Sequence, residues 1–250
     1  MTSESTATFS WPDGIQCAVS VSFDDARHSQ VDRGIPLLNE HGVKGTFYVS
    51  WQMVEDRLDD WAAAIETGHE IGNHTMRHPC GANFGFSIDG CLEQYTLEKM
   101  DEDIREATDI IQRELNITPT TFAYPCGQKY VGVGEDCRSY VPVVARHFLV
   151  GRGFRDEIFN NPGVCDLAQI NGTDFDNTPF ETIKSLVDWA RKCGGWIAFA
   201  GHEVGDGGGQ VVIADALAEL CRYAADETNG IWLDTVNAVG RYIAEARNGT

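Results

Sequence analysis

The amino-acid sequence predicts a single α/β domain built on a mostly parallel sheet. Short apolar, β-rich segments alternate with segments of helical periodicity along the chain. This alternation favours parallel strands joined by crossover helices that lie outside the sheet. The 250 residues suit one unit, and neither a repeat nor a Pro/Gly/Ser-rich linker divides them. The pattern alone leaves a barrel and an open doubly wound sheet as alternatives.

The predicted elements follow one another closely. Strands are expected at 17–23, 45–50, 69–74, 120–125, 148–150 and 195–201. Helices are expected at 35–43, 59–68, 95–115, 138–147, 180–193, 211–227 and from about 234. Gly42 and Gly68 stand where helices would end, Thr96 where one would begin, and Pro125 where a strand would stop. The predicted domain is 1–250, with a core of about 15–205 followed by C-terminal helices.

The composition limits the classes of partner and compartment. Acidic residues (38 Asp and Glu) outnumber basic residues (19 Lys and Arg), so a net charge of −19 disfavours nucleic acid and anionic membranes as partners. No apolar stretch approaches the length of a membrane span, and the polar N-terminus shows no secretory signal. We therefore expect a cytoplasmic protein. Its eight cysteines form no CxxC pair, so free and mostly buried thiols are expected. The oligomeric state stays open, a homo-oligomer included.

Two polar clusters predict a metal site at the carboxyl end of the sheet. Asp24 and Asp25 end an apolar strand, where adjacent carboxylates repel unless a cation lies nearby. In an extended chain they point to opposite sides, so one can ligate a metal while the other acts as a base. His74 and His78 have the spacing of one face of a helical turn and could grip the same ion. An acidic loop start and a chance surface His pair are the structural alternatives.

Two further clusters follow later strands. The turn Tyr124-Pro125-Cys126-Gly127 could aim a backbone N–H at an oxyanion, although a plain turn explains it as well. Cys126 is not expected to be a nucleophile, because no Cys–His–Asp spacing supports it. His202 ends the strand GWIAFAG and is either a structural residue or a general acid with a pKa near working pH.

Together and in this order, the four clusters resemble the polysaccharide deacetylase family, also called the NodB-homology domain or carbohydrate esterase family 4. The resemblance runs from about Cys17 to about His202. SFDD is similar to the family's first motif, TFDD, and HTMRH to its second, H-[ST]-x-x-H. AYPCG is similar to a variant of the third motif, R-x-P-Y, and FAGHE to the last, L-x-H. The resemblance implies a distorted (β/α) barrel with fewer than eight strands.

The resemblance also implies roles for individual residues. Asp25, His74 and His78 would bind a divalent metal, zinc in the first instance, with cobalt or nickel equally suited to three N/O ligands. Asp24 would be the general base and His202 the general acid, and the backbone amide of Cys126 would bind the oxyanion. A water activated by the metal would then remove the acetyl group.

Two features depart from the family pattern. The arginine of the third motif, which orients the base, aligns with Ala123, and we expect Arg152 to replace it. The fourth motif, of the D-W type, is absent, which leaves Asp166, Asp174 and Asp176 as candidates to steady His202. The segment 80–91 follows the second motif directly and is expected either in the substrate cleft or in a surface loop.

Three functions stay open from the sequence. The first is N- or O-deacetylation of a carbohydrate, with an acetylated oligosaccharide or a small acylated molecule as the substrate. The second is an amidase or cyclic-imide hydrolase that uses the same metal site on a small molecule. The third is a catalytically inactive carbohydrate-binding module, against which the second carboxylate argues, because metal binding alone does not require Asp24.

Overall fold

A fully buried strand, β1 (Cys17–Asp24), runs through the middle of the protein. In the computed structural model, which describes residues 9–88 and 90–248, β9 (Trp196–Gly201) pairs along one side of β1. The other side pairs first with β12 (Ile231–Leu233) and then with β2 (Thr46–Val49). Even the serines of this strand are satisfied internally, since Ser22 Oγ donates to the Phe199 carbonyl at 2.6 Å. The strand is therefore held from both sides up to the carboxylate that ends it.

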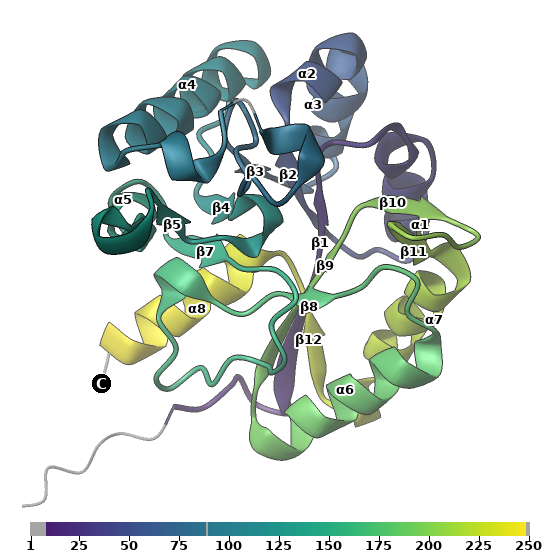
Figure 1. The fold of residues 1–250 in the computed structure, drawn as a ribbon. Coiled ribbons are helices and arrows are strands. Elements are labelled where there is room, and N and C mark those ends of the chain that lie inside the picture. Colours follow the sequence, from purple (N-terminus) through teal and green to yellow (C-terminus); the bar gives the residue numbers. More distant parts are fainter. Residues whose placement is uncertain (1–8, 89, 249–250) are drawn as a thin grey trace, which may run out of the picture.

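The main sheet is parallel throughout and curls toward closure (Figure 1). Its order is β7 (Val150–Arg152), β4 (Thr121–Ala123), β3 (Glu70–Asn73), β2, β1, β9 and β8 (Thr173–Asp174), with β12 beside β1. The edge strand β7 meets the segment leading into β8, because Ile170 bridges Gly151 and Gly153 through backbone bonds of 2.8 Å each. The predicted α/β fold, a distorted (β/α) barrel with a mostly parallel sheet, is confirmed.

Helices surround this sheet (Figure 1). They are α1 (Ile35–Glu40), α2 (Trp51–Val54), α3 (Leu58–Glu66), α4 (Leu97–Leu115), α5 (Val141–His147), α6 (Phe180–Cys193), α7 (Ala214–Ala225) and α8 (Val236–Asn248). Several predicted helix ends are confirmed. Gly42 and Gly68 follow α1 and α3 with φ values of 67° and 92°, a region that glycine enters at little cost. Thr96 caps α4 by accepting from the Lys99 amide.

Three predicted boundaries are wrong because short strands precede or displace the expected elements. The helix expected from 138 begins at Val141, since Arg138–Ser139 (β6) pairs with Tyr130–Val131 (β5). The helix expected from 211 begins at Ala214, since Val211–Ile213 (β11) pairs with Glu203–Gly205 (β10). The strand expected at 148–150 lies at 150–152. The predicted domain limits stay a prediction, and residues 1–8, 89 and 249–250 lie outside the described part of the chain.

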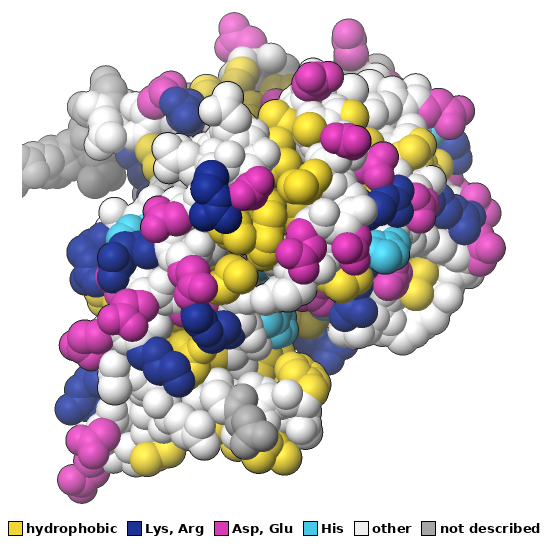
Figure 2. Space-filling model, turned by 90° about the horizontal axis from the view of Figure 1, so that it is seen from above, with side chains coloured by type: hydrophobic (Ala, Val, Ile, Leu, Met, Phe, Trp, Pro, Cys, Tyr) yellow, Lys and Arg dark blue, Asp and Glu magenta, His cyan; other side chains and the backbone are white. Residues whose placement is uncertain are grey.

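The charged side chains are distributed rather than gathered on the face that Figure 2 shows. Acidic side chains alternate there with lysines and arginines, with hydrophobic side chains between them. Despite the net charge of −19, this face therefore carries no single patch of one sign. Within residues 9–88 and 90–248, no helix is both long and apolar enough to cross a bilayer.

The stability of the protein should depend on Gly151, which lies in the edge strand β7 where the sheet meets the segment leading into β8. A Cβ at this position would lie 2.3 Å from the Ala168 carbonyl oxygen, where the backbone has no room to yield. We expect Gly151→Ala to lower the free energy of unfolding by about 1–3 kcal/mol, measured by urea denaturation. Gly209→Ala is the matched control, since a Cβ there meets nothing within 4 Å. Equal stability of the two variants would contradict the packing argument.

Candidate active site

The carboxyl ends of β1, β3, β4 and β9 open into one pocket of about 460 Å³. Parallel strands deliver their carboxyl ends to the same edge of a sheet, so residues distant in sequence meet there. The residues that line this pocket are Asp24, Asp25, Arg27, His74, His78, Phe84, Phe86, Cys126, Phe154, Arg155, His202 and Gln210. Every residue predicted for the site therefore lines the pocket except Arg152, which lies behind its wall.

The two adjacent carboxylates do not point to opposite sides, as an extended chain would have required. Asp24 ends β1, but Asp25 has a φ of 75° and Ala26 a φ of 56°, so the chain turns at once. This left-handed turn brings both carboxylates to the same pocket. The prediction was wrong because the alternation of side chains in an extended strand does not hold in a tight turn.

His74 and His78 lie on a loop and not on the predicted helical turn. Thr75 and His78 have φ values of 62° and 49°, which no right-handed helix contains. The loop is held by the buried carboxylate of Asp103, which accepts from the Met76 and Arg77 amides at 2.7 and 3.0 Å. Folded in this way, the loop still brings the two rings within 4.8 Å of each other, centroid to centroid.

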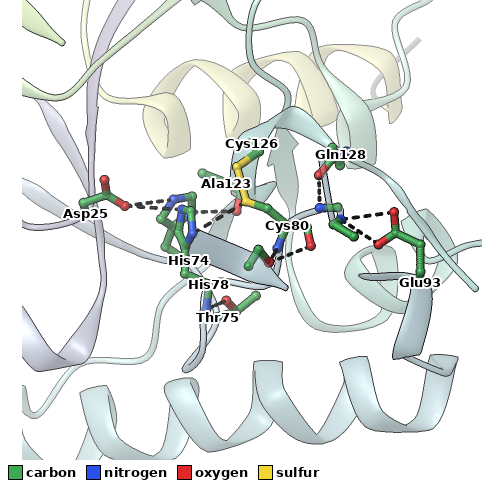
Figure 3. The surroundings of a disulfide bond; sticks show 12 residues. Asp25, His74, Thr75, His78, Cys80, Glu93, Ala123, Cys126 and Gln128 are labelled. Carbon is green, nitrogen blue, oxygen red and sulfur yellow. Dashed lines mark hydrogen bonds and ion pairs between the residues drawn. A yellow bond between two sulfur atoms is a disulfide. The ribbon is translucent and has the colours of Figure 1, made fainter. Parts of the chain in front are cut away.

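Asp25, His74 and His78 form a donor set that fits a metal ion (Figure 3). Asp25 Oδ1 lies 3.6 Å from His74 Nε2 and 3.4 Å from His78 Nε2. His74 Nδ1 lies 2.9 Å from the Ala123 carbonyl, an acceptor that assigns the ring proton to Nδ1 and the lone pair to Nε2. Nε2 itself is buried and has no hydrogen-bond partner. An orphaned lone pair facing a carboxylate and a second imidazole is what a divalent metal would satisfy.

The charges around this donor set keep it in a form that can ligate. Burial alone would raise the pKa of Asp25, but the neighbouring His74, His78 and Arg27 outweigh burial and lower it. Burial and the nearby His74 lower the pKa of His78 to about 4. A carboxylate and an uncharged imidazole are the forms of these side chains that bind metals.

Arg152 contacts Asp24, as expected of the residue that replaces the arginine of the third motif. It is fully buried, and Nη2 donates to Asp24 Oδ1. The guanidinium also lies over the Tyr48 ring, 4.9 Å from its centroid, and Nη1 donates to the Gly153 carbonyl at 2.7 Å. A planar group held at three points fixes the carboxylate that it binds. Ala123, which aligns with the missing arginine, contributes its carbonyl to His74 instead.

Asp176 is the aspartate that holds His202. Its carboxylate accepts from the His202 backbone amide at 3.0 Å and lies 2.6 Å from His202 Nδ1. The other two candidates are engaged elsewhere, because Asp166 caps a 3₁₀ turn and Asp174 pairs with Arg155. Burial would lower the pKa of His202, but the bond to Asp176 and the negative charges of Asp24, Asp176 and Asp25 raise it above the usual value.

The expectation of eight free thiols is wrong, because Cys80 and Cys126 form a disulfide. The remaining cysteines are free. The pair is 46 residues apart in sequence, but β3 and β4 are adjacent strands, so the loops that leave them meet. The bond also fixes the start of segment 80–91, from which Phe84 and Phe86 line the pocket. Phe84 and Phe86 therefore place part of this segment at the pocket.

Several residues of the site escaped the sequence analysis. Gln30 is fully buried, and its Nε2 donates to the Asp24 and His202 carbonyls at 2.6 and 2.9 Å, joining the ends of β1 and β9. Arg27 donates to Asp25 Oδ2 through Nε and Nη2, at 3.2 and 2.9 Å. Asp103 holds the loop of the two histidines. Arg27 lies only two residues after Asp25 in the sequence, which could have identified it as a partner of that carboxylate. Gln30 and Asp103 have no such sequence signal, because their contacts depend on the folded structure.

A protein-family model described as polysaccharide deacetylase matches residues 13–140. The peptidoglycan-N-acetylglucosamine deacetylase PgdA of Listeria monocytogenes is 25% identical over 119 residues, which are 47% of this chain and 23% of that protein. Chitin deacetylase 1 of Cryptococcus neoformans is 28% identical over 107 residues, 43% of this chain and 20% of that protein. The chain spans 5% to 29% of the length of the curated relatives it matches.

Solved structures show the same fold over nearly the whole chain. The family 4 acetyl xylan esterase of Clostridium thermocellum, in complex with a cobalt ion, superposes with a TM-score of 0.59 and 18% identity, covering 90% of this chain and 91% of that one. The peptidoglycan deacetylase PdaC of Bacillus subtilis gives a TM-score of 0.55 and 19% identity, covering 95% of this chain and 96% of that one. At these identities the likeness concerns the fold.

The two adjacent aspartates should differ sharply in metal binding. Asp25→Ala removes one of three donors, so we expect the affinity for Zn²⁺ to fall by more than about 100-fold in competition titrations with a chromophoric chelator. Asp24→Asn should leave that affinity within a few-fold of the wild type, because Asp24 is held by Arg152 and lies outside the donor set. Equal losses in both variants would contradict this division.

Proposed function

Because the chain belongs to the polysaccharide deacetylase family, we propose that it is a hydrolase that removes acetyl groups from an acetylated carbohydrate with the help of a divalent metal. The observation that carries the proposal is the arrangement of the pocket. Asp25, His74 and His78 form the donor set, while Asp24 and His202 stand beside it with partners of their own. Zinc is the proposed metal, and cobalt or nickel would suit the same ligands.

The protein's own groups would share the work of hydrolysis. When bound, the metal would polarise the acyl carbonyl and lower the pKa of water. Asp24, fixed by Arg152, would accept the proton of the attacking water. His202, oriented by Asp176, would donate a proton to the leaving nitrogen or oxygen. The backbone amide of Cys126, on the pocket wall, is proposed as an oxyanion donor.

The pocket wall bears on the substrate. Phe84, Phe86 and Phe154 give it an aromatic lining that could pack against the apolar face of a sugar ring. The same lining and the volume of about 460 Å³ also suit a small amide or cyclic imide, which is the second candidate. An inactive carbohydrate-binding module is disfavoured, because such a module would not require the buried Arg152–Asp24 and Asp176–His202 pairs.

Hydrolysis by the purified protein tests this proposal. Acetate release from chitooligosaccharides, acetylated xylan and small amides should be abolished by chelation and restored by Zn²⁺. Asp24→Asn should lower kcat by roughly 10²- to 10⁴-fold while zinc stays bound. Acetate release that persists after chelation and in Asp25→Ala would rule out the metal mechanism, and full activity of Asp24→Asn would rule out its role as the base.

The pH dependence of kcat tests the partner of His202. The protonated ring is the donating form, and Asp176, Asp24 and Asp25 raise its pKa, so activity should persist to higher pH than an unpaired histidine would allow. Asp176→Asn removes the charge nearest the ring, and we expect the alkaline limb of the kcat profile to move to lower pH. Asp166→Asn, which alters only a 3₁₀ cap, should leave that limb in place. A limb unmoved by Asp176→Asn would show that another group donates the proton.

A further inference from the structure

The two histidines of the donor set differ in what holds their outer nitrogen. His74 Nδ1 faces a carbonyl oxygen, the kind of acceptor that normally fixes a metal-binding imidazole. His78 Nδ1 faces Cys80 Sγ at 3.7 Å, and that sulfur belongs to the disulfide (Figure 3). The ring is 28% exposed and its backbone amide donates to Thr75 Oγ1 at 2.9 Å. The disulfide sulfur is therefore the ring's polar neighbour on the side away from Asp25.

The disulfide is itself held firmly from behind. The Cys80 amide donates to Ser87 Oγ at 2.9 Å, and this hydroxyl donates back to the Cys80 carbonyl at 2.7 Å. The next amide, that of Gly81, donates to Gln128 Oε1 at 2.6 Å, two residues beyond Cys126. Both ends of the bridge are thus tied to the loops that leave β3 and β4. A sulfur fixed in this way can orient the ring beside it.

We propose that the Cys80–Cys126 disulfide is a positioning element that sets the metal-binding form of His78. A disulfide sulfur carries no proton, so it can only accept, and it favours the tautomer with hydrogen on Nδ1 and the lone pair on Nε2. That lone pair points toward Asp25 and His74. The bond also holds Cys126, whose φ is 54°, at the pocket wall. This inference rests on the metal site of the proposed function, but its test does not require hydrolysis.

Reduction would reverse both effects. A trialkylphosphine and one water convert the disulfide to two thiols and the phosphine oxide, a two-electron change that breaks the S–S bond. The Cys80 thiol can then donate to His78 Nδ1, which favours the tautomer with the ring proton on Nε2. In that tautomer Nε2 has no free lone pair with which to bind a metal. The freed sulfurs also become soft donors, and both lie within 4.8 Å of a His78 ring nitrogen. Oxidised and reduced protein should therefore bind metal differently.

Zinc affinity tests the inference without any substrate. We expect Cys80→Ala/Cys126→Ala to bind Zn²⁺ about 10- to 100-fold more weakly than the oxidised wild type, in competition with a chromophoric chelator. With Co²⁺ as the probe, phosphine-reduced wild type should show thiolate-to-metal charge-transfer absorption that the oxidised protein and the alanine variant lack. Nitrogen NMR of metal-free protein should place the His78 ring proton on Nδ1 when oxidised and shift it on reduction.

The exposed free thiols supply the matched control. Cys137→Ser/Cys193→Ser keeps the disulfide and removes two surface thiols, so it should match the wild type in both redox states. Circular dichroism and urea denaturation show whether the alanine variant folds. If it does not, the His78 nitrogen spectrum of the reduced wild type replaces its affinity measurement. Zinc affinity within two-fold across oxidised, reduced and folded alanine forms, with an unchanged His78 spectrum, would overturn the inference.

The result of this zinc-affinity test can be distinguished from the result of the hydrolysis test of the proposed function. Loss of zinc affinity in the folded Cys80→Ala/Cys126→Ala variant supports the positioning role even where no acetylated substrate is hydrolysed. Conversely, a deacetylase whose zinc affinity and kcat are indifferent to reduction keeps the function and loses this inference.

Discussion

The site depends on a buried strand that ends in two adjacent carboxylates. Asp24 and Asp25 repel each other, and nothing in the packing of β1 would select that pair for stability. The surrounding structure separates the two charges by giving each its own partner. Arg152 reaches Asp24 from β7, whereas Arg27 and the loop after β3 surround Asp25. The proposed division of labour between a base and a metal ligand thus begins with the positively charged side chain that each carboxylate contacts.

An acidic chain also places basic side chains at this pocket. The protein carries a net charge of −19, yet Arg27 and Arg155 line the cavity, and Arg152 lies behind it. These arginines follow strand ends, so their field is local to the pocket, and on the face that Figure 2 shows acidic side chains are interspersed with basic ones. Under the proposed function, local charge and not net charge would determine the field at an acyl carbonyl or a developing oxyanion.

The sequence predicted the fold and most of the pocket because both depend on local signals. Strand ends followed by polar residues identify the edge of the sheet that carries the pocket, and Asp24, Asp25, His74, His78 and His202 all line that pocket. The loop of His74 and His78 was mistaken for a helical turn, since the spacing of two histidines does not report the positive φ of Thr75. Asp103, Gln30 and the Cys80–Cys126 pairing act across the fold, and no local pattern encodes a partner so many residues away.

The disulfide changes what the cysteines imply. A disulfide is at odds with the reducing cytoplasm in which free thiols were expected, and the cytoplasmic location stays a prediction. The bond lies where the departure from the third motif lies, since Cys126 takes the position of an aromatic residue in the family pattern. Placing a sulfur there joins the loop of the metal ligands to the loop of the proposed oxyanion donor. The departure from the motif at Cys126 and the sulfur partner of His78 then have one structural cause.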